Sequence, residues 1–176
     1  MPINMQSSEL PDAHLRKALA YWQHKRGARH MPQRADIDPV EMPDLLPFVR
    51  LVEVVAPGQY RYRLVGTEVE QFHGGLKFNG RFVHEALPPA LAVHIVPVYD
   101  DCVRERRPIF LENTFLVPHT DRVARHSRVL YLPLSQDDQT VSMVLVVQVF
   151  VVIEPGAPYT FDPWSTHYME IQRRVL

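Results

Sequence analysis

The sequence contains few of the residues that would point to a disulfide-stabilised, metal-dependent or membrane-spanning protein. Its one cysteine, Cys102, excludes an internal disulfide and a zinc site built from cysteines alone. The longest apolar stretch, residues 141–153, is interrupted by Ser142 and Gln148 and falls short of the roughly 20 residues that a membrane helix needs. The first residues lack the basic and apolar segments of a secretory signal. We therefore expect a cytoplasmic protein without a membrane span.

Glycine is scarce, and neither sign of charge is in excess. The 176 residues include 7 glycines against 16 prolines, so proline is the main source of local breaks in the chain. With 19 Lys and Arg against 20 Asp and Glu, the formal net charge is −1, which argues against a nucleic-acid partner. A hydrophobic content of 46% over this length is typical of one domain that buries its own core.

The first 47 residues predict a helix followed by a proline-rich linker. Leu15, Leu19 and Trp22 recur at helical spacing, so this apolar stripe must be buried against its own domain or against a partner. We assign these three residues to a homodimer interface. In the linker, Asp38 before Pro39 predicts a short, capped helix.

Residues 48–153 predict a sheet with a crossover helix, and residues 154–176 a helical extension. Strands are expected at residues 49–55, 60–64, 109–117, 123–134 and 141–153. A long helix is expected at 88–107, and Asp162 is expected to cap a last helix that runs to the end of the chain. The predicted fold class is α+β, a five-stranded antiparallel sheet with helices on one face and N-terminal and C-terminal flanking helices.

Several short motifs follow one another in a distinctive order. They are Trp22, Arg29, Pro32, Arg34, Asp36-Ile37-Asp38-Pro39, Leu45-Leu46-Pro47, Tyr62-Arg63-Leu64-Val65-Gly66-Thr67, Gly80-Arg81, Arg106-Arg107-Pro108 and Leu132-Pro133-Leu134-Ser135. With this order of elements, the chain from about residue 10 to residue 153 resembles the small stand-alone bacterial PAS domains, the PAS_5 group. The resemblance implies a PAS fold and a sensory or protein-interaction role in bacterial signal transduction, with an unknown signalling protein as partner.

The sequence offers no convincing active site. It has no G-x-S-x-G, P-loop or H-E-x-x-H motif, and the neighbours His126 and Ser127 lie on one strand and would point to opposite faces. We therefore expect no enzymatic activity, no metal and no resident cofactor. The alternatives are a ligand- or cofactor-carrying domain or small enzyme that uses an interior cavity, and a membrane-peripheral adaptor that uses the C-terminal helix.

Most of the nine histidines are expected at the surface, in loops or on polar faces. His94 differs because it shares one face of the long helix with Leu91 and Ile95. Some haem-binding PAS domains carry their axial ligand on the corresponding helix, so one interpretation is a haem held by His94. The other is a histidine of the core or of an interface.

A small-molecule pocket between the sheet and the long helix is the expected binding site. Its candidate residues are Tyr62, Leu64, Tyr131 and Met143 from the strands and His94, Val98 and Cys102 from the helix. Mostly apolar walls with a few placed polar groups are typical of ligand sites. The other interpretation is that the same side chains fill the core.

Overall fold

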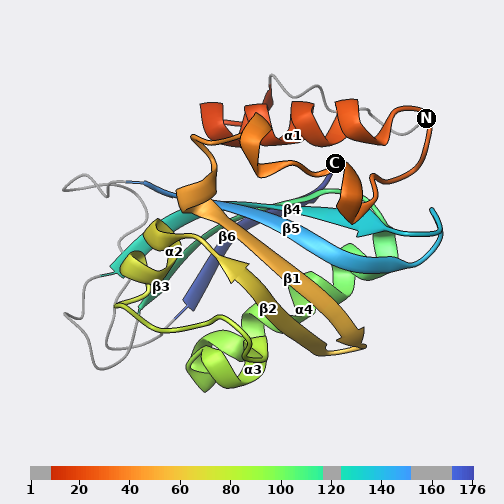
Figure 1. The fold of residues 1–176 in the computed structure, drawn as a ribbon. Coiled ribbons are helices and arrows are strands. Elements are labelled where there is room, and N and C mark those ends of the chain that lie inside the picture. Colours follow the sequence, from red (N-terminus) through yellow and green to blue (C-terminus); the bar gives the residue numbers. More distant parts are fainter. Residues whose placement is uncertain (1–8, 117–123, 152–167) are drawn as a thin grey trace.

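A six-stranded antiparallel sheet forms the centre of the molecule in the computed structural model, which describes residues 9–116, 124–151 and 168–176. The strands are β1 (Val49–Ala56), β2 (Gln59–Val65), β3 (Ile109–Leu116), β4 (Ala124–Ser135), β5 (Val141–Val151) and β6 (Tyr168–Val175). Their order across the sheet is β2-β1-β5-β4-β3-β6, and neighbouring strands are antiparallel (Figure 1). The first five lie where the sequence pattern predicts them.

Helices occupy the segments between these strands and the N-terminal region. They are α1 (Ala13–Arg26), α2 (Thr67–Phe72), α3 (Val83–Ala86), α4 (Pro89–Glu105) and the 3-10 helices η2 (Arg34–Asp36), η3 (Pro39–Glu41) and η4 (Leu46–Phe48). The predicted cap before Pro39 is confirmed, since the Asp38 carboxylate accepts a hydrogen bond from the Val40 amide.

Helix α1 packs on one face of the sheet through its apolar stripe. The Asp12 carboxylate caps its first turn. Leu15, Leu19 and Trp22 are buried within the protomer, and the Trp22 indole donates a hydrogen bond of 2.8 Å to the Pro133 carbonyl of β4. The assignment of these residues to a homodimer interface is therefore wrong, because the sheet of the same chain already covers them.

Helix α4 packs against the other face of the sheet, so the long helix of the core and the predicted N-terminal flanking helix α1 lie on opposite faces (Figure 1). Figure 1 shows α1 on one side of the strands and α4 on the other. The buried face of α4 carries Leu91, Val98, Tyr99 and Cys102. Pro97 lies inside the helix, where it removes one backbone hydrogen bond. Coverage on both faces explains the nearly continuous hydrophobic sequences of β4 and β5.

The C-terminal segment is a strand where the sequence pattern predicts a helix. Residues 168–175 form β6 and pair with β3, whereas the predicted cap at Asp162 lies outside the described residues. Pairing with β3 decides the outcome, because β3 would otherwise expose unpaired backbone groups at the sheet edge. This strand also removes the helix that the membrane-peripheral alternative required.

Strand β2 contains an irregularity that reverses one predicted side-chain direction. Leu51 pairs with Leu64, but the next residue, Val52, pairs with Tyr62, so Arg63 is an extra residue in β2. A bulge of this kind shifts the alternation of side chains. Leu64 therefore faces away from Tyr62 and is 42% exposed, against the prediction that both face inward.

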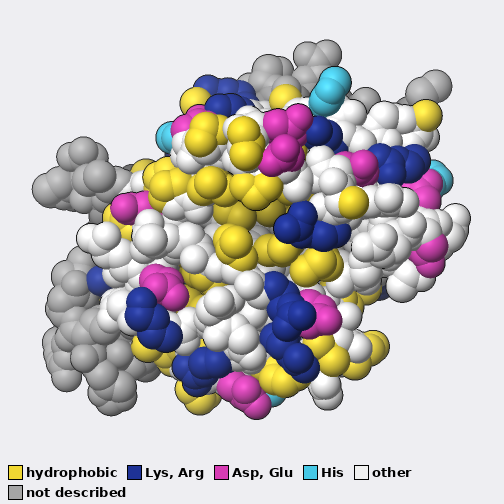
Figure 2. Space-filling model, in the orientation of Figure 1, with side chains coloured by type: hydrophobic (Ala, Val, Ile, Leu, Met, Phe, Trp, Pro, Cys, Tyr) yellow, Lys and Arg dark blue, Asp and Glu magenta, His cyan; other side chains and the backbone are white. Residues whose placement is uncertain are grey.

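The surface near α1 mixes apolar and charged side chains. Figure 2 shows hydrophobic side chains gathered below α1 and, farther down, basic and acidic side chains next to one another. This interspersion agrees with the formal net charge of −1. Of the helices in the described ranges, none has the length and hydropathy to cross a membrane.

Candidate functional site

A pocket lies on the α4 side of the sheet. Its walls are Arg50, Asn113, Phe115, Val129, Tyr131, Gln148 and Tyr168 from the strands and His73, Leu87, Leu91 and Ile95 from the helical side. The cavity itself is about 20 Å³, room for about one water molecule, and it opens to solvent. A small ligand therefore needs the walls to move apart.

Arg50 is the positively charged group of this lining. It pairs across the sheet with Val146, two residues before Gln148, and side chains two apart on a strand share a face. Arg50 is only 4% exposed and its Nε has no hydrogen-bond partner. In the described parts of the chain, no carboxylate forms an ion pair with Arg50. A buried charge without a counter-charge is energetically costly.

Tyrosine side chains lie close to Arg50. Burial acts to lower the pKa of Arg50, but the phenols of Tyr99, Tyr62 and Tyr131 outweigh it and raise the pKa overall. Burial in turn raises the pKa of each of these phenols, so all three remain protonated donors. The hydroxyls of Tyr62 and Tyr99 have no hydrogen-bond partner among the described residues. The region thus combines one cation with unused donors.

His73 follows the end of α2 and lies at the wall of the pocket. Its ring stacks on Phe115 with centroids 4.8 Å apart and meets Phe78 edge-on at 5.3 Å. Burial, together with the positive charge of Arg50, lowers the pKa of His73 from 6.5 to about 3. His73 is therefore neutral near pH 7. Its ring nitrogens make no hydrogen bond of full geometry with the described residues, although the Gln148 side chain is close enough to oppose part of the lowering of the pKa.

A polar row crosses three strands beside the pocket. The Gln148 amide donates to the Ser127 hydroxyl at 3.1 Å, and Ser127 donates to the Asn113 side-chain oxygen at 2.6 Å. The side-chain oxygen of Gln148 is a buried acceptor that no described residue bonds. The row therefore fixes the orientation of Gln148 and leaves one acceptor for another molecule.

A second polar cluster lies on the opposite face of the sheet and is internally bonded. The Glu112 carboxylate lies 3.0 Å from His126 Nε2 and accepts from Arg128 Nε at 2.8 Å and Gln172 Nε2 at 2.5 Å. Burial acts to raise the pKa of Glu112, but hydrogen bonds from Gln172 and Arg128 outweigh it and lower the pKa. These contacts join β3, β4 and β6, so we assign the cluster a structural role.

The structure brings only one predicted pocket residue, Tyr131, into the pocket wall. Tyr62, Val98 and Cys102 are buried on the same side of the sheet without lining the pocket. Met143 is an odd number of residues from Gln148 along β5, so it points toward the α1 side. Leu64 lies at the surface because of the bulge in β2.

His94 also lies outside the pocket wall. Its side chain is exposed and stacks on Tyr168 with ring centroids 4.4 Å apart. This position does not fit a haem bound by His94 in the pocket. Elsewhere in the described ranges, no group of three His, Cys, Asp or Glu side chains is arranged to hold a metal ion.

The sequence interpretation missed Arg50, His73 and Gln148. His73 and His126 are buried, whereas the other described histidines are exposed or partly exposed, as expected for most of them. A usable signal was present in the sequence, since Arg50 stands between Val49 and Leu51, and Gln148 stands between Val147 and Val149. A polar residue in a strand covered on both faces must be buried and therefore needs a partner.

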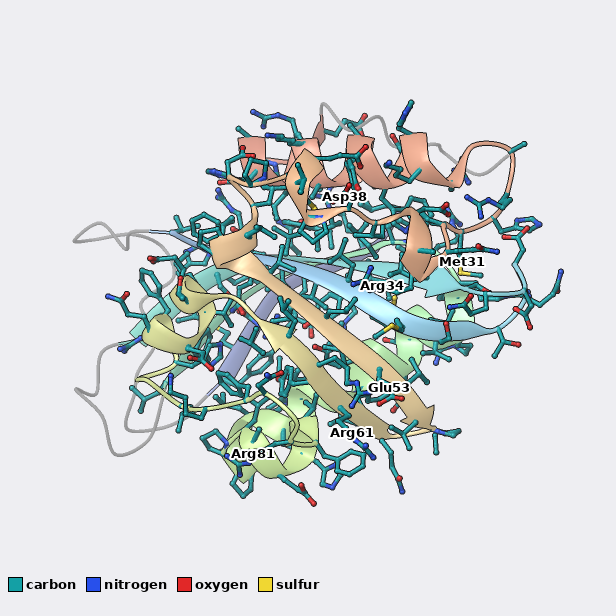
Figure 3. All side chains as sticks on the ribbon, viewed as in Figure 1. Met31, Arg34, Asp38, Glu53, Arg61 and Arg81 are labelled. Atoms are coloured by element: carbon teal, nitrogen blue, oxygen red, sulfur yellow. The ribbon has the colours of Figure 1, made fainter. Side chains whose placement is uncertain are left out.

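Charged side chains around the β1–β2 hairpin and the linker are already engaged. Figure 3 labels Met31, Arg34, Asp38, Glu53, Arg61 and Arg81 in this region. Arg34 donates to the Ile37 carbonyl, Arg61 lies 4.7 Å from the centroid of the Phe82 ring, and Arg81 donates to the Glu85 carbonyl. Glu53 Oε2 has no hydrogen-bond partner among the described residues, but it lies 3.6 Å from Arg63 Nε and so has a counter-charge.

Comparison with known proteins identifies the family. A family model described as PAS domain matches residues 11–148, which is most of the chain. The chain therefore belongs to the PAS domain family, whose members are generally non-enzymatic sensory modules. No curated protein matches the sequence.

Similar solved structures are also PAS domains. The PAS domain of BvgS from Bordetella pertussis has a TM-score of 0.49 and 16% identity, covering 66% of this chain and 89% of its own. A PAS domain from Colwellia psychrerythraea has a TM-score of 0.45 and 15% identity, covering 65% of this chain and 98% of its own.

Proposed function

We propose that this chain is a non-enzymatic PAS-type sensory module in bacterial signal transduction that binds a small ligand between the sheet and α4. One observation carries the proposal. Arg50, His73 and Gln148 are buried around one hollow with polar atoms that no described residue bonds. Buried polar groups are normally bonded, so a group of three around one space indicates an occupant.

The composition of the wall favours binding over catalysis. Within the described residues that line the pocket there is no carboxylate, thiol or lysine, and the one histidine is held neutral. Nucleophilic and acid–base catalysis generally need such groups in pairs. The apolar walls and few polar groups instead match the character of recognition sites.

A bound ligand would contact α4 and β6 at the same time. The pocket wall combines Leu91 and Ile95 of α4 with Tyr168 of β6. A ligand that contacts these elements differently in two arrangements shifts the balance between them. We propose that the signal then leaves through contact with a second copy of the chain or with another signalling protein in the cytoplasm.

Blocking the pocket tests ligand binding. Ile95→Phe places a larger side chain at the wall, whereas Val93→Phe changes an exposed position of the same helix and serves as the control. Each protein is incubated with the low-molecular-mass fraction of a bacterial extract and measured by native mass spectrometry. We expect an adduct on the wild type and on Val93→Phe, and none on Ile95→Phe. An adduct-free wild type, or equal adducts on all three proteins, contradicts ligand binding in this pocket.

Light scattering over a concentration series tests the homodimer. A dimer doubles the apparent mass as protein concentration rises. A constant monomer mass, with and without the extract fraction, would leave contact with another protein as the route of the signal.

A further inference from the structure

We propose that the ligand of this pocket is a compact organic monoanion whose carboxylate is held by Arg50. The inference rests on the proposed function, because it names the chemical class of the ligand that the same pocket binds. It follows from the charge and hydrogen-bonding capacity of the wall, taken group by group.

The buried positive charge of Arg50 needs a counter-charge. Arg50 is always protonated, is 4% exposed and faces a hollow whose described walls contain no acidic side chain. A neutral occupant would leave this cation without a counter-charge in a low-dielectric site. An anion supplies the missing charge and accepts hydrogen bonds from the guanidinium, including Nε, which has no acceptor in the described part of the chain.

The charge of the wall favours a carboxylate over a phosphate. A phosphate group carries more negative charge and generally gathers several basic side chains or backbone amides at a helix start. Arg50 is the single cation of the described wall, and His73 beside it remains neutral. One guanidinium matches one carboxylate in both charge and planar geometry.

The other groups of the pocket wall restrict the rest of the ligand. The unused Gln148 oxygen is an acceptor, so it calls for a hydroxyl or another donor on the ligand. A ligand ammonium is disfavoured by the Arg50 charge, which already depresses the pKa of His73. Leu87, Leu91 and Phe115 provide an apolar surface for the carbon skeleton. The best match is therefore a small hydroxycarboxylate.

The test compares acids with their uncharged amides. The full chain is titrated with acetate, glycolate and lactate and with acetamide, glycolamide and lactamide, and binding is followed by calorimetry and by the thermal unfolding midpoint. We expect at least one acid to bind about 10- to 100-fold more tightly than its amide, since hydrogen bonds to a charged group are the strong ones. Amides that bind as well as their acids, or acids that all fail to bind, overturn the inference.

Variants of Arg50 locate the effect. Arg50→Met keeps a side chain of similar length but removes the charge. Arg50→Lys keeps the charge but removes the planar guanidinium. The control, Arg63→Met, removes an exposed charge from the neighbouring strand. We expect acid binding to be lost in Arg50→Met, weakened in Arg50→Lys and unchanged in Arg63→Met. If Arg50→Met does not fold, the acid–amide comparison and Arg50→Lys still decide the question.

Failure of the inference about Arg50 can be distinguished from failure of the proposed ligand binding. An adduct from the bacterial extract that persists on Arg50→Met shows that the pocket binds a ligand but that Arg50 does not select it. Absence of any adduct on the wild type removes the proposed function itself.

Discussion

Single residues on the two faces of the sheet differ in whether their polar atoms have partners. On the α1 side, Glu112 is bonded by residues of neighbouring strands. On the α4 side, Arg50 and His73 retain unbonded nitrogens although they are equally buried. Because buried polar atoms are normally paired, this difference is the basis for treating the α4 side as the proposed binding site and the Glu112 cluster as structural.

His73 is expected to make stability depend on pH. Its pKa is about 3 in the fold against an ordinary value of 6.5, so between these values the unfolded chain binds a proton that the folded chain does not. Stability contributed by neutral His73 is therefore full above about pH 6.5 and falls as the pH drops, by about 1.4 kcal/mol per pH unit. Urea unfolding of the wild type and His73→Leu at several pH values measures the difference, which should shrink or reverse toward low pH. Parallel profiles for the two proteins would contradict this assignment.

Gly66 is expected to tolerate no side chain. Its amide donates to the Val49 carbonyl at 2.7 Å, and a Cβ at this position would overlap the carbonyl oxygens of Pro47 and Leu46. We expect Gly66→Ala to lower the free energy of unfolding by about 3 kcal/mol, since the obstacle is backbone that cannot rotate away. Gly58→Ala is the control, because its Cβ meets no atom within 4 Å and only its φ of +73° adds strain of about 1 kcal/mol. Equal effects of the two substitutions in urea unfolding would show that the overlap relaxes.

At the scale of elements, β6 both completes the sheet and closes the pocket. It covers the edge of β3, whose side chains are buried along the whole strand. Arg173 of β6 forms an ion pair of 2.5 Å with Asp101 of α4, and Arg107 donates to the Leu176 carbonyl at 2.9 Å. Tyr168 of the same strand lines the pocket. The C-terminal strand therefore forms part of the pocket wall.

Removal of residues 168–176 is expected to destabilise the protein. The deletion uncovers β3 and loses the buried side chains of Tyr168 and Leu176, which together contribute about 3 kcal/mol or more. An uncovered strand edge also promotes association, so aggregation should accompany the loss. Urea unfolding and light scattering measure both effects. Val175→Thr, at a position 41% exposed, is the control and should change stability by less than about 0.5 kcal/mol. An unchanged midpoint after the deletion would contradict a structural role for β6.

At the scale of the whole molecule, helices on both faces make the sheet the middle layer of three. α1 and α4 bury their apolar faces in one continuous core that includes Trp22, Leu19 and Tyr99. A shared core predicts that the layers unfold together, since no layer retains a buried surface of its own once the sheet is lost.

Cooperative unfolding can be checked with the tryptophan of α1. In a Trp164→Phe background, fluorescence reports on Trp22 alone, and circular dichroism reports on the whole backbone. We expect the two signals to give coincident urea transitions. Leu19→Ala should shift both by the same amount and lower stability by about 2–5 kcal/mol. A separate, earlier fluorescence transition would show that α1 detaches independently.

The sequence predicted the positions of helices and strands better than it predicted side-chain directions and the residues that line the pocket. The strands from β1 to β5 and the long helix α4 follow from hydrophobic periodicity, which is a local property. Leu64 shows where periodicity fails, because the extra residue at Arg63 depends on pairing with β1. Of the candidate pocket residues, Tyr131 alone lines the pocket, since strand alternation does not reveal which face lies beneath α4.

The amino-acid sequence by itself determined the class of fold, the family motifs and the amphipathic character of α1, because each depends on residues close together in the chain. Tertiary structure decided that α1 covers its own sheet, that residues 168–175 pair with β3, and that Arg50, His73 and Gln148 surround one space. Those outcomes join segments far apart in the sequence. The free energies that decide these outcomes come from the burial of apolar side chains and from whether buried polar atoms find partners. Both are settled only when the layers have packed together.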